Sequence, residues 1–152
     1  MWVRLEDGAN AGYELFQKND ASLDHLPVLG MSNITRTLLA GIDYDDAARR
    51  RVENFHILKS FLERENLIHF ELSDQIPMYY PFRCKVPGLR EFLATRNIYI
   101  ARCWKNVERF YRESENFERN LVNEIYPLII DQRYNQEDML RQVEVIHEAI
   151  GA

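Results

Sequence analysis

The chain has 152 residues, of which 46% are hydrophobic and 28% are charged, and its formal net charge is −5. This length allows one domain with its own core and is short for two. The negative charge disfavours nucleic acid and anionic membranes as partners, since both repel an acidic chain. No apolar run approaches the roughly 20 residues that span a bilayer, and the first residues, MWVRLEDGAN, lack the apolar core of a secretory signal. We therefore expect a cytoplasmic protein.

Residues 1–30 are the least patterned part of the sequence. The stretch GANAGYELFQKNDASLDHLP mixes Gly, Asn, Asp and Pro and predicts an irregular N-terminal arm. Two interpretations stay open: the arm crosses to another domain or subunit, or it is a partly frayed terminus. Residues 31–152 are expected to form the folded domain.

Five helices are predicted beyond residue 31. Ser32 and Asp43 are each followed by apolar residues three or four positions apart, which predicts a short capped helix to about residue 41 and a long capped helix to about residue 64. Pro87 suits the first turn of a helix that stops near residue 97, and a short helix is predicted from residue 117 to 125. Asn135, with Asp138 three residues later, predicts the cap of a final amphipathic helix.

Four strands are predicted between these helices. They are residues 67–72 (LIHFEL), 78–86 (MYYPFRCKV), 98–104 (IYIARCW) and 126–130 (YPLII). Pro81 places the second of them at an edge or a bulge, because proline has no N–H to donate. The expected fold is therefore α+β, with a small, mostly antiparallel sheet of about four strands, helices packed on one face, and a long helix before the sheet.

No catalytic centre is visible in the residue pattern. The glycines are scattered, so there is no phosphate-binding loop, and the histidines lack metal-ligand spacing: His25, His56, His69 and His147. Cys84 and Cys103 lie on separate predicted strands, and we favour reduced thiols over a disulfide. The run Arg49–Arg51 is either a solvated flank of the long helix, which we favour, or an anion site.

Three stretches of the sequence resemble motifs of one enzyme family. GMSNITRTLLAGID, from Gly30, is similar to an R-M-S-N-(I/L)-x-A-A segment, and ARRRVENFHIL, from Ala48, is similar to the RR-x-N-(F/Y)-x-x-L pattern that follows it. YPLIIDQRYNQEDMLRQVEVI, from Tyr126, is similar to the closing LP(I/L)DQRY-x-x-(E/D)DM pattern. The family is the DegT/DnrJ/EryC1/StrS family of pyridoxal phosphate (PLP) enzymes, and the resemblance covers roughly residues 30–150 in the same order.

This resemblance implies that the chain is the C-terminal small domain of a fold-type I PLP aminotransferase. In that family a large N-terminal domain carries the cofactor lysine, so the remainder would lie upstream of Met1. The lysines of this chain lack the Ser-rich, Gly-flanked setting that the family uses: Lys18, Lys59, Lys85 and Lys105. We therefore expect no cofactor and no catalytic residue on this chain alone. The implied partners are the PLP-binding large domain and a second subunit in a homodimer.

The resemblance also implies two substrate-binding residues after the third predicted strand. Arg102 would hold a substrate carboxylate or phosphate through a bidentate fork, and Trp104 would form an apolar wall. In the alternative, Arg102 pairs with a surface acid and Trp104 packs in the core. The run Asp131–Arg133 is interpreted as a tight turn before the last helix rather than as a site.

The chain departs from the family just before Met31. Residues 28–30 are Val, Leu and Gly, where the family has Asn-(Tyr/Phe)-Arg, a segment that reaches the cofactor phosphate of the partner subunit. A second hypothesis stays open, in which the chain is a stand-alone, non-catalytic binding or regulatory module derived from such a small domain. That hypothesis predicts a polar surface at the former domain interface, whereas an exposed apolar patch would favour the first.

Overall fold

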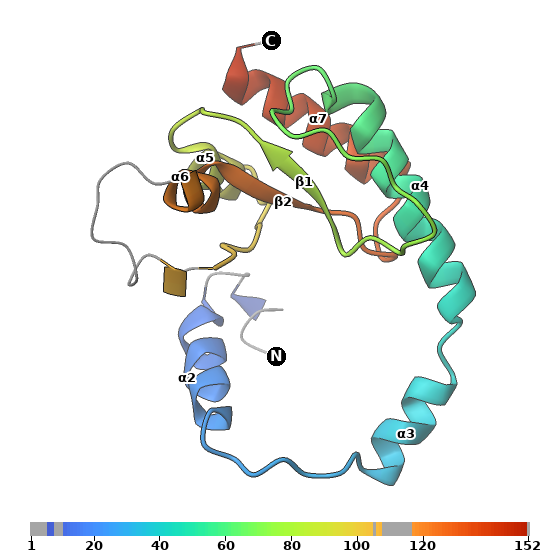
Figure 1. The fold of residues 1–152 in the computed structure, drawn as a ribbon. Coiled ribbons are helices and arrows are strands. Elements are labelled where there is room, and N and C mark those ends of the chain that lie inside the picture. Colours follow the sequence, from blue (N-terminus) through green and yellow to red (C-terminus); the bar gives the residue numbers. More distant parts are fainter. Residues whose placement is uncertain (1–5, 8–10, 105, 108–116, 152) are drawn as a thin grey trace. The chain divides into compact units, whose positions relative to one another are not determined.

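A computed structural model of the chain describes residues 6–7, 11–104, 106–107 and 117–151 (Figure 1). It divides the chain into two compact units, one ending at Ile42 and the other beginning at Asp43. The first unit holds α2 (Tyr13–Leu23) and α3 (Asn33–Ala40); the second holds α4 (Tyr44–Leu62), β1 (Tyr79–Arg83), α5 (Leu89–Thr95), α6 (Phe117–Glu124), β2 (Ile125–Ile129) and α7 (Gln136–Ile150).

Helix α2 lies in the segment for which the sequence predicted an irregular arm, so this segment is more regular than expected. The predicted domain limits, 1–30 and 31–152, stay a prediction. In the part of the chain that the structure describes, no helix is both long and apolar enough to cross a bilayer.

The capping residues predicted from the sequence are confirmed for three helices. Ser32 Oγ accepts a backbone N–H at 3.1 Å at the start of α3, and Asp43 Oδ1 accepts the Asp46 N–H at 2.9 Å at the start of α4. Asn135 and Asp138 form a reciprocal capping box at α7. Because the first N–H groups of a helix have no partner inside the helix, these side chains determine where each helix begins.

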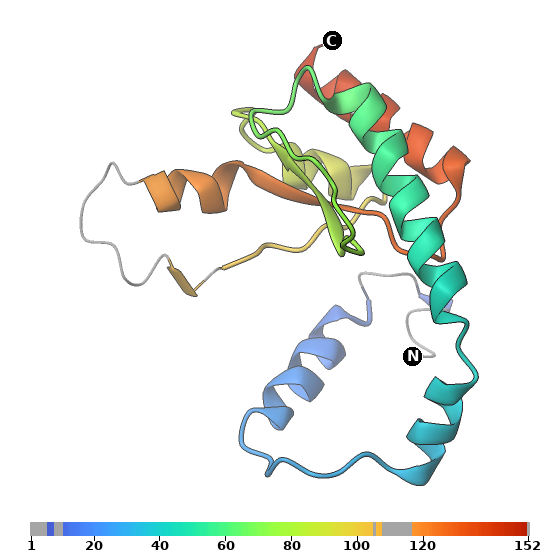
Figure 2. The same cartoon turned by 45° about the vertical axis from the view of Figure 1, so that its right-hand side comes forward.

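The core of the second unit lies between the sheet and the helices α4 and α7, which run side by side (Figures 1 and 2). The long helix predicted from Asp43 supplies one wall of this core, and α5 contacts α7. Each large apolar side chain that is fully buried contributes about 1.5–3 kcal/mol to folding. The largest of them are Phe82, Leu58, Leu62, Leu89, Leu93, Leu128, Ile130, Met139 and Ile146.

The predicted four-stranded sheet is wrong. Among the described residues the sheet has two antiparallel strands, β1 and β2, with Tyr80 opposite Leu128 and Pro81 opposite Pro127. The mixed α+β class is compatible with the observed elements, but residues 67–72 and 98–104 are not strands. Side chains occupy the outer edges of β1 and β2 where the missing strands would have paired.

The outer edge of β1 is satisfied by the buried side chain of Asn66. Its Oδ1 accepts the Arg83 N–H at 2.9 Å, and its Nδ2 donates to the Pro81 carbonyl at 2.9 Å. The Leu67 N–H donates to the Arg83 carbonyl at 2.9 Å, and Pro81 itself has no N–H. Among the described residues, Leu67 is thus the one residue of 67–72 with a backbone hydrogen bond to this edge, and from residue 81 to 83 no further backbone group is left with which a ladder could continue.

The outer edge of β2 is satisfied in the same way at both ends. Arg90 donates to the Ile125 carbonyl at 3.4 Å and, through its other terminal nitrogen, to the carbonyls of residues 100 and 101 at 3.3 and 2.5 Å. Gln142 Nε2 donates to the Ile129 carbonyl at 2.9 Å. The guanidinium group thus joins residues 100–101 to β2 in place of direct backbone pairing, so the predicted third strand does not form.

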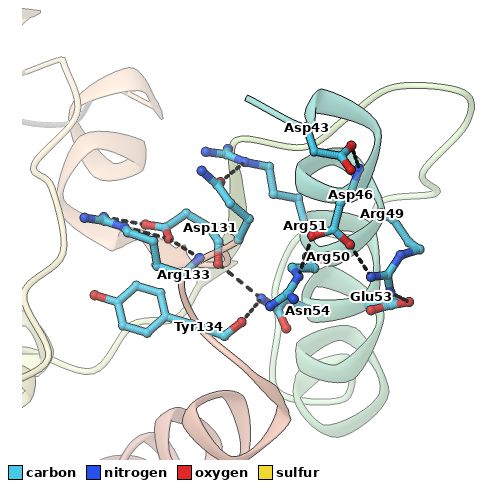
Figure 3. Close-up of polar contacts among 11 residues, drawn as sticks. Asp43, Asp46, Arg49, Arg50, Arg51, Glu53, Asn54, Asp131, Arg133 and Tyr134 are labelled. Carbon is cyan, nitrogen blue, oxygen red and sulfur yellow. Dashed lines mark hydrogen bonds and ion pairs between the residues drawn. The ribbon is translucent and has the colours of Figure 1, made fainter. Parts of the chain in front are cut away.

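The buried Asn54 joins α4 to the turn that precedes α7. Its Nδ2 donates to the carbonyls of Ile130, Asp131 and Tyr134 at 3.3, 3.3 and 3.1 Å. Figure 3 shows the contacts to Asp131 and Tyr134. An amide nitrogen has two hydrogens, so these three contacts share them. One side chain therefore supplies the donors for a turn that lies 76 positions or more away in the sequence.

We expect Asn54→Ala to lower the free energy of unfolding by about 2 kcal/mol or more, because it leaves partly buried carbonyls without a donor. Urea unfolding followed by circular dichroism measures this loss. Gln136→Ala removes an exposed amide at the start of α7 and is the matched control, with an expected change within about 0.5 kcal/mol. Equal losses for the two variants would contradict the assigned role of Asn54.

Candidate functional site

A cavity of about 360 Å³ lies between the loop after β1, helix α5 and the end of α6. This volume is at the lower end of the range for ligand pockets. The chain turns from β1 into α5 at Gly88, whose φ of +74° favours glycine, and α5 begins after this residue rather than at the predicted Pro87. Arg90 lies in the first turn of that helix and lines the cavity, as do Lys85 and Arg102.

Of the two predicted substrate-binding residues, Arg102 belongs to the cavity lining and Trp104 does not. Arg102 lines it and donates through Nη2 to Asn123 Oδ1 at 3.2 Å. Trp104 is two residues away, is 55% exposed, and has a φ of +53°. A bulky side chain adopts that backbone conformation only where the surroundings hold it, and such residues are frequent at functional sites. The exposure does not fit the alternative in which Trp104 packs in the core, and the substrate roles of both residues stay a prediction.

Arg90 is the residue at this cavity that the sequence did not single out. It is half-buried, its guanidinium carbon lies 5.5 Å from the centre of the Tyr126 ring, and its hydrogen bonds go to backbone carbonyls. No carboxylate of the described residues forms an ion pair with it. Burial lowers the pKa of Arg90 below its ordinary value, and the positive charge of Arg102 acts in the same direction.

One of the two carboxylates that line the cavity is already paired with an arginine. Glu124 accepts hydrogen bonds from Arg83 Nε and Nη2 at 2.9 and 2.7 Å, and both side chains are less than one-fifth exposed, at 19% and 17%. Arg83 also lies over the Phe117 ring, 5.4 Å from its centre. The charge of Glu124 is therefore already paired outside the cavity lining. The other charged side chains that line the cavity are one acid and three bases: Glu91, Lys85, Arg90 and Arg102.

The turn interpretation of residues 131–133 agrees with the contacts in the structure. Asp131 Oδ1 accepts the Arg133 N–H at 3.0 Å, and its two oxygens accept from the Arg133 guanidinium at 3.0 and 2.7 Å (Figure 3). Gln132 accepts from Arg51 Nε at 3.0 Å. These side chains hold the turn and the start of α7 against α4, which is a structural role.

The arginine run on α4 is mostly a solvated flank, as the sequence predicted. Arg49 pairs with Asp46 and with Glu53, the latter at 2.7 Å, and Arg50 pairs with Asp46 at 2.9 Å (Figure 3). Pairs of this kind on an exposed helix face contribute about 0.3–0.5 kcal/mol each. Arg51 instead reaches the turn before α7.

Both cysteines are free thiols. Cys84 is buried and Cys103 is partly buried, and burial raises the pKa of Cys84, which makes its thiol a poor nucleophile. Within the described part of the chain, no group of His, Cys, Asp and Glu side chains could hold a metal ion.

The described lysines do not fit a Schiff base with PLP. Lys59 Nζ donates to Glu71 at 2.7 Å and to the Phe70 carbonyl at 2.8 Å, and the hydrogen bond to Glu71 raises the pKa of Lys59. A protonated amine cannot attack an aldehyde, and Schiff-base lysines are activated by removal from water. Lys18 and Lys85 are exposed. The fourth lysine, at position 105, lies outside the described residues.

A scan against models of known protein families matches none of them, and a search of curated proteins finds no match either. The resemblance to the DegT/DnrJ/EryC1/StrS family stays a prediction from the motifs.

We expect the contribution of Asp131 to stability to depend on pH. Its pKa lies below the usual 3.8, chiefly because of the hydrogen bonds from the Arg133 guanidinium, while partial burial acts in the opposite direction. A carboxyl group with a depressed pKa stabilises the fold fully above its unfolded-state pKa, and this contribution is lost as the pH falls through the folded-state pKa. Urea unfolding should therefore show a stability deficit for Asp131→Asn at pH 6 that shrinks below pH 3.8.

Arg133→Gln is the matched control for this prediction, because it removes the largest cause of the shift. In that background, Asp131→Asn should have a smaller effect at pH 6. A deficit that is the same at pH 6 and pH 3 would contradict the assigned pairing.

Proposed function

We propose that this chain acts as the C-terminal small domain of a PLP-dependent aminotransferase of the DegT/DnrJ/EryC1/StrS type. In this role it shapes the substrate pocket and a dimer surface and is not catalytic by itself. The PLP would be held by a large N-terminal domain, since the described lysines of this chain do not fit a Schiff base. When bound there, PLP supplies the electron sink of transamination. Arg102 and Trp104 would contact the substrate.

The observation that carries the proposal is the contact between two of the three resembling stretches. Asn54, in ARRRVENFHIL, donates to the backbone of residues 130–134, in IIDQRY, and Arg51 of the first stretch donates to Gln132 of the second (Figure 3). Two motifs that are far apart in sequence are thus parts of one hydrogen-bonded unit. This gives a physical reason for the joint occurrence of the two motifs, and it supports the resemblance as more than a chance match.

Helices α2 and α3 of the first unit carry exposed apolar residues, which is compatible with this proposal. Neither helix has a buried residue. In residues 28–42 several large apolar side chains are at least half exposed, with Ile34 at 75% and Leu29 at 78%. Exposed apolar residues grouped along one segment indicate a surface that another protein part covers. A stand-alone module would instead be expected to have a polar surface here.

The proposal predicts that PLP is attached outside these 152 residues. An antibody against the chain recovers the native protein from its source cells, and borohydride then reduces any Schiff base to a stable amine. After digestion, mass spectrometry should find a pyridoxyl group on a lysine of a further segment, either in the same polypeptide or in one bound to it. An untreated sample is the control, because its PLP is released on denaturation.

Two results would overturn the proposal. A pyridoxyl group on Lys59 or on another lysine of this chain would mean that the chain holds the cofactor itself. A recovered protein of 18.1 kDa that contains no PLP and no second polypeptide would instead support the stand-alone module.

A further inference from the structure

We propose that the cavity lined by Lys85, Arg90 and Arg102 binds a small oxyanion, namely the phosphate or carboxylate group of a metabolite. This site lies within one unit of the chain and would bind its ligand whether or not the proposed PLP domain is present. An experiment that refutes anion binding therefore does not refute the proposed function, and the reverse also holds.

The first argument is charge. Three cationic side chains line the cavity, and of the two carboxylates there, Glu124 is already held by two hydrogen bonds from Arg83. Among the described residues that line the cavity, the bases outnumber the acids three to two, although the chain as a whole has a net charge of −5. An excess of basic groups in a concave site attracts anions and repels cations.

The second argument is the state of the Arg90 guanidinium. Of its five N–H groups, two on Nη1 and one on Nη2 are used by the backbone carbonyls of residues 100, 101 and 125. The Nε–H and the second Nη2 N–H have no partner among the described residues. Nε and Nη2 form the side of the guanidinium that binds two oxygens of one carboxylate or phosphate. Arg83 uses the same two nitrogens to hold Glu124.

The third argument is rigidity. Three backbone carbonyls and the face of the Tyr126 ring hold Arg90 in place. A ligand would therefore not have to order this side chain, which reduces the entropy lost on binding. Arg90 is also half-buried and has no carboxylate partner in the described part of the chain, so a bound oxyanion would supply the missing counter-charge.

Isothermal titration calorimetry of the whole chain at constant ionic strength tests this proposal. Inorganic phosphate is the probe for a phosphate group, and glutamate is the probe for a carboxylate. Arg102→Gln is expected to weaken binding of the preferred anion about tenfold, the loss typical of one charged hydrogen bond. Lys85→Gln, which removes an exposed charge, should weaken it a few-fold. Arg90 is not the first target, because its replacement would also remove the contacts to residues 100, 101 and 125.

Arg50→Gln is the matched control, since it removes an exposed arginine of α4 that does not line the cavity. Tighter binding of phosphate identifies a phosphorylated ligand, and tighter binding of glutamate identifies a carboxylate ligand. The proposal is overturned if neither anion shows saturable binding to the wild-type chain. It is also overturned if Arg50→Gln weakens binding as much as Arg102→Gln, because the attraction would then be a property of the overall charge.

Discussion

The second unit depends on one constraint, which is that the backbone groups along both edges of its sheet must find partners. Two strands alone are marginal in water. Here the outer edge of β1 is satisfied by the Asn66 side chain and the Leu67 N–H, and two carbonyls of the β2 edge are satisfied by Arg90 and Gln142. Because side chains occupy these edges, the sheet stays two strands wide and needs α4 and α7 to bury its apolar face. Asn54 then fixes α7 by holding the turn that leads into it.

The family motifs therefore describe architecture more than chemistry. Asn54 and the turn at residues 130–134 lie in two of the resembling stretches, and the hydrogen bonds between them hold the fold together. Asp131 and Arg133 pair with each other, which leaves neither of them free for a substrate. The resemblance over these residues therefore concerns the architecture of the domain, and the family assignment stays a prediction. The argument for a ligand depends on a different set of side chains, at the cavity beside α5.

The local elements of the fold could be predicted from sequence, and the sheet could not. Caps such as Ser32, Asp43 and Asn135 act within three residues, so the sequence around them is sufficient. The alternation in residues 67–72 and 98–104 predicted strands that do not form, because a pattern of apolar residues carries no information on what occupies the neighbouring edge. The same limit applies to the site. Arg102 was singled out through the resemblance and its substrate role stays a prediction, whereas Arg90 resembles any arginine on a helix until the fold brings its guanidinium to β2 and to the cavity.

Arg90 connects the fold and the cavity, because one guanidinium group serves both. Its terminal nitrogens hold residues 100–101 beside β2, and its Nε–H is left without a hydrogen bond among the described residues and can donate to an oxyanion. Arg102 follows directly after the segment that Arg90 holds. A bound anion would neutralise part of the positive charge of Arg90. Because a ligand stabilises the state to which it binds, the anion would also stabilise the attachment of residues 100–101 to the sheet. We therefore expect anion binding in the cavity to stabilise the hydrogen bonds that Arg90 makes at the β2 edge.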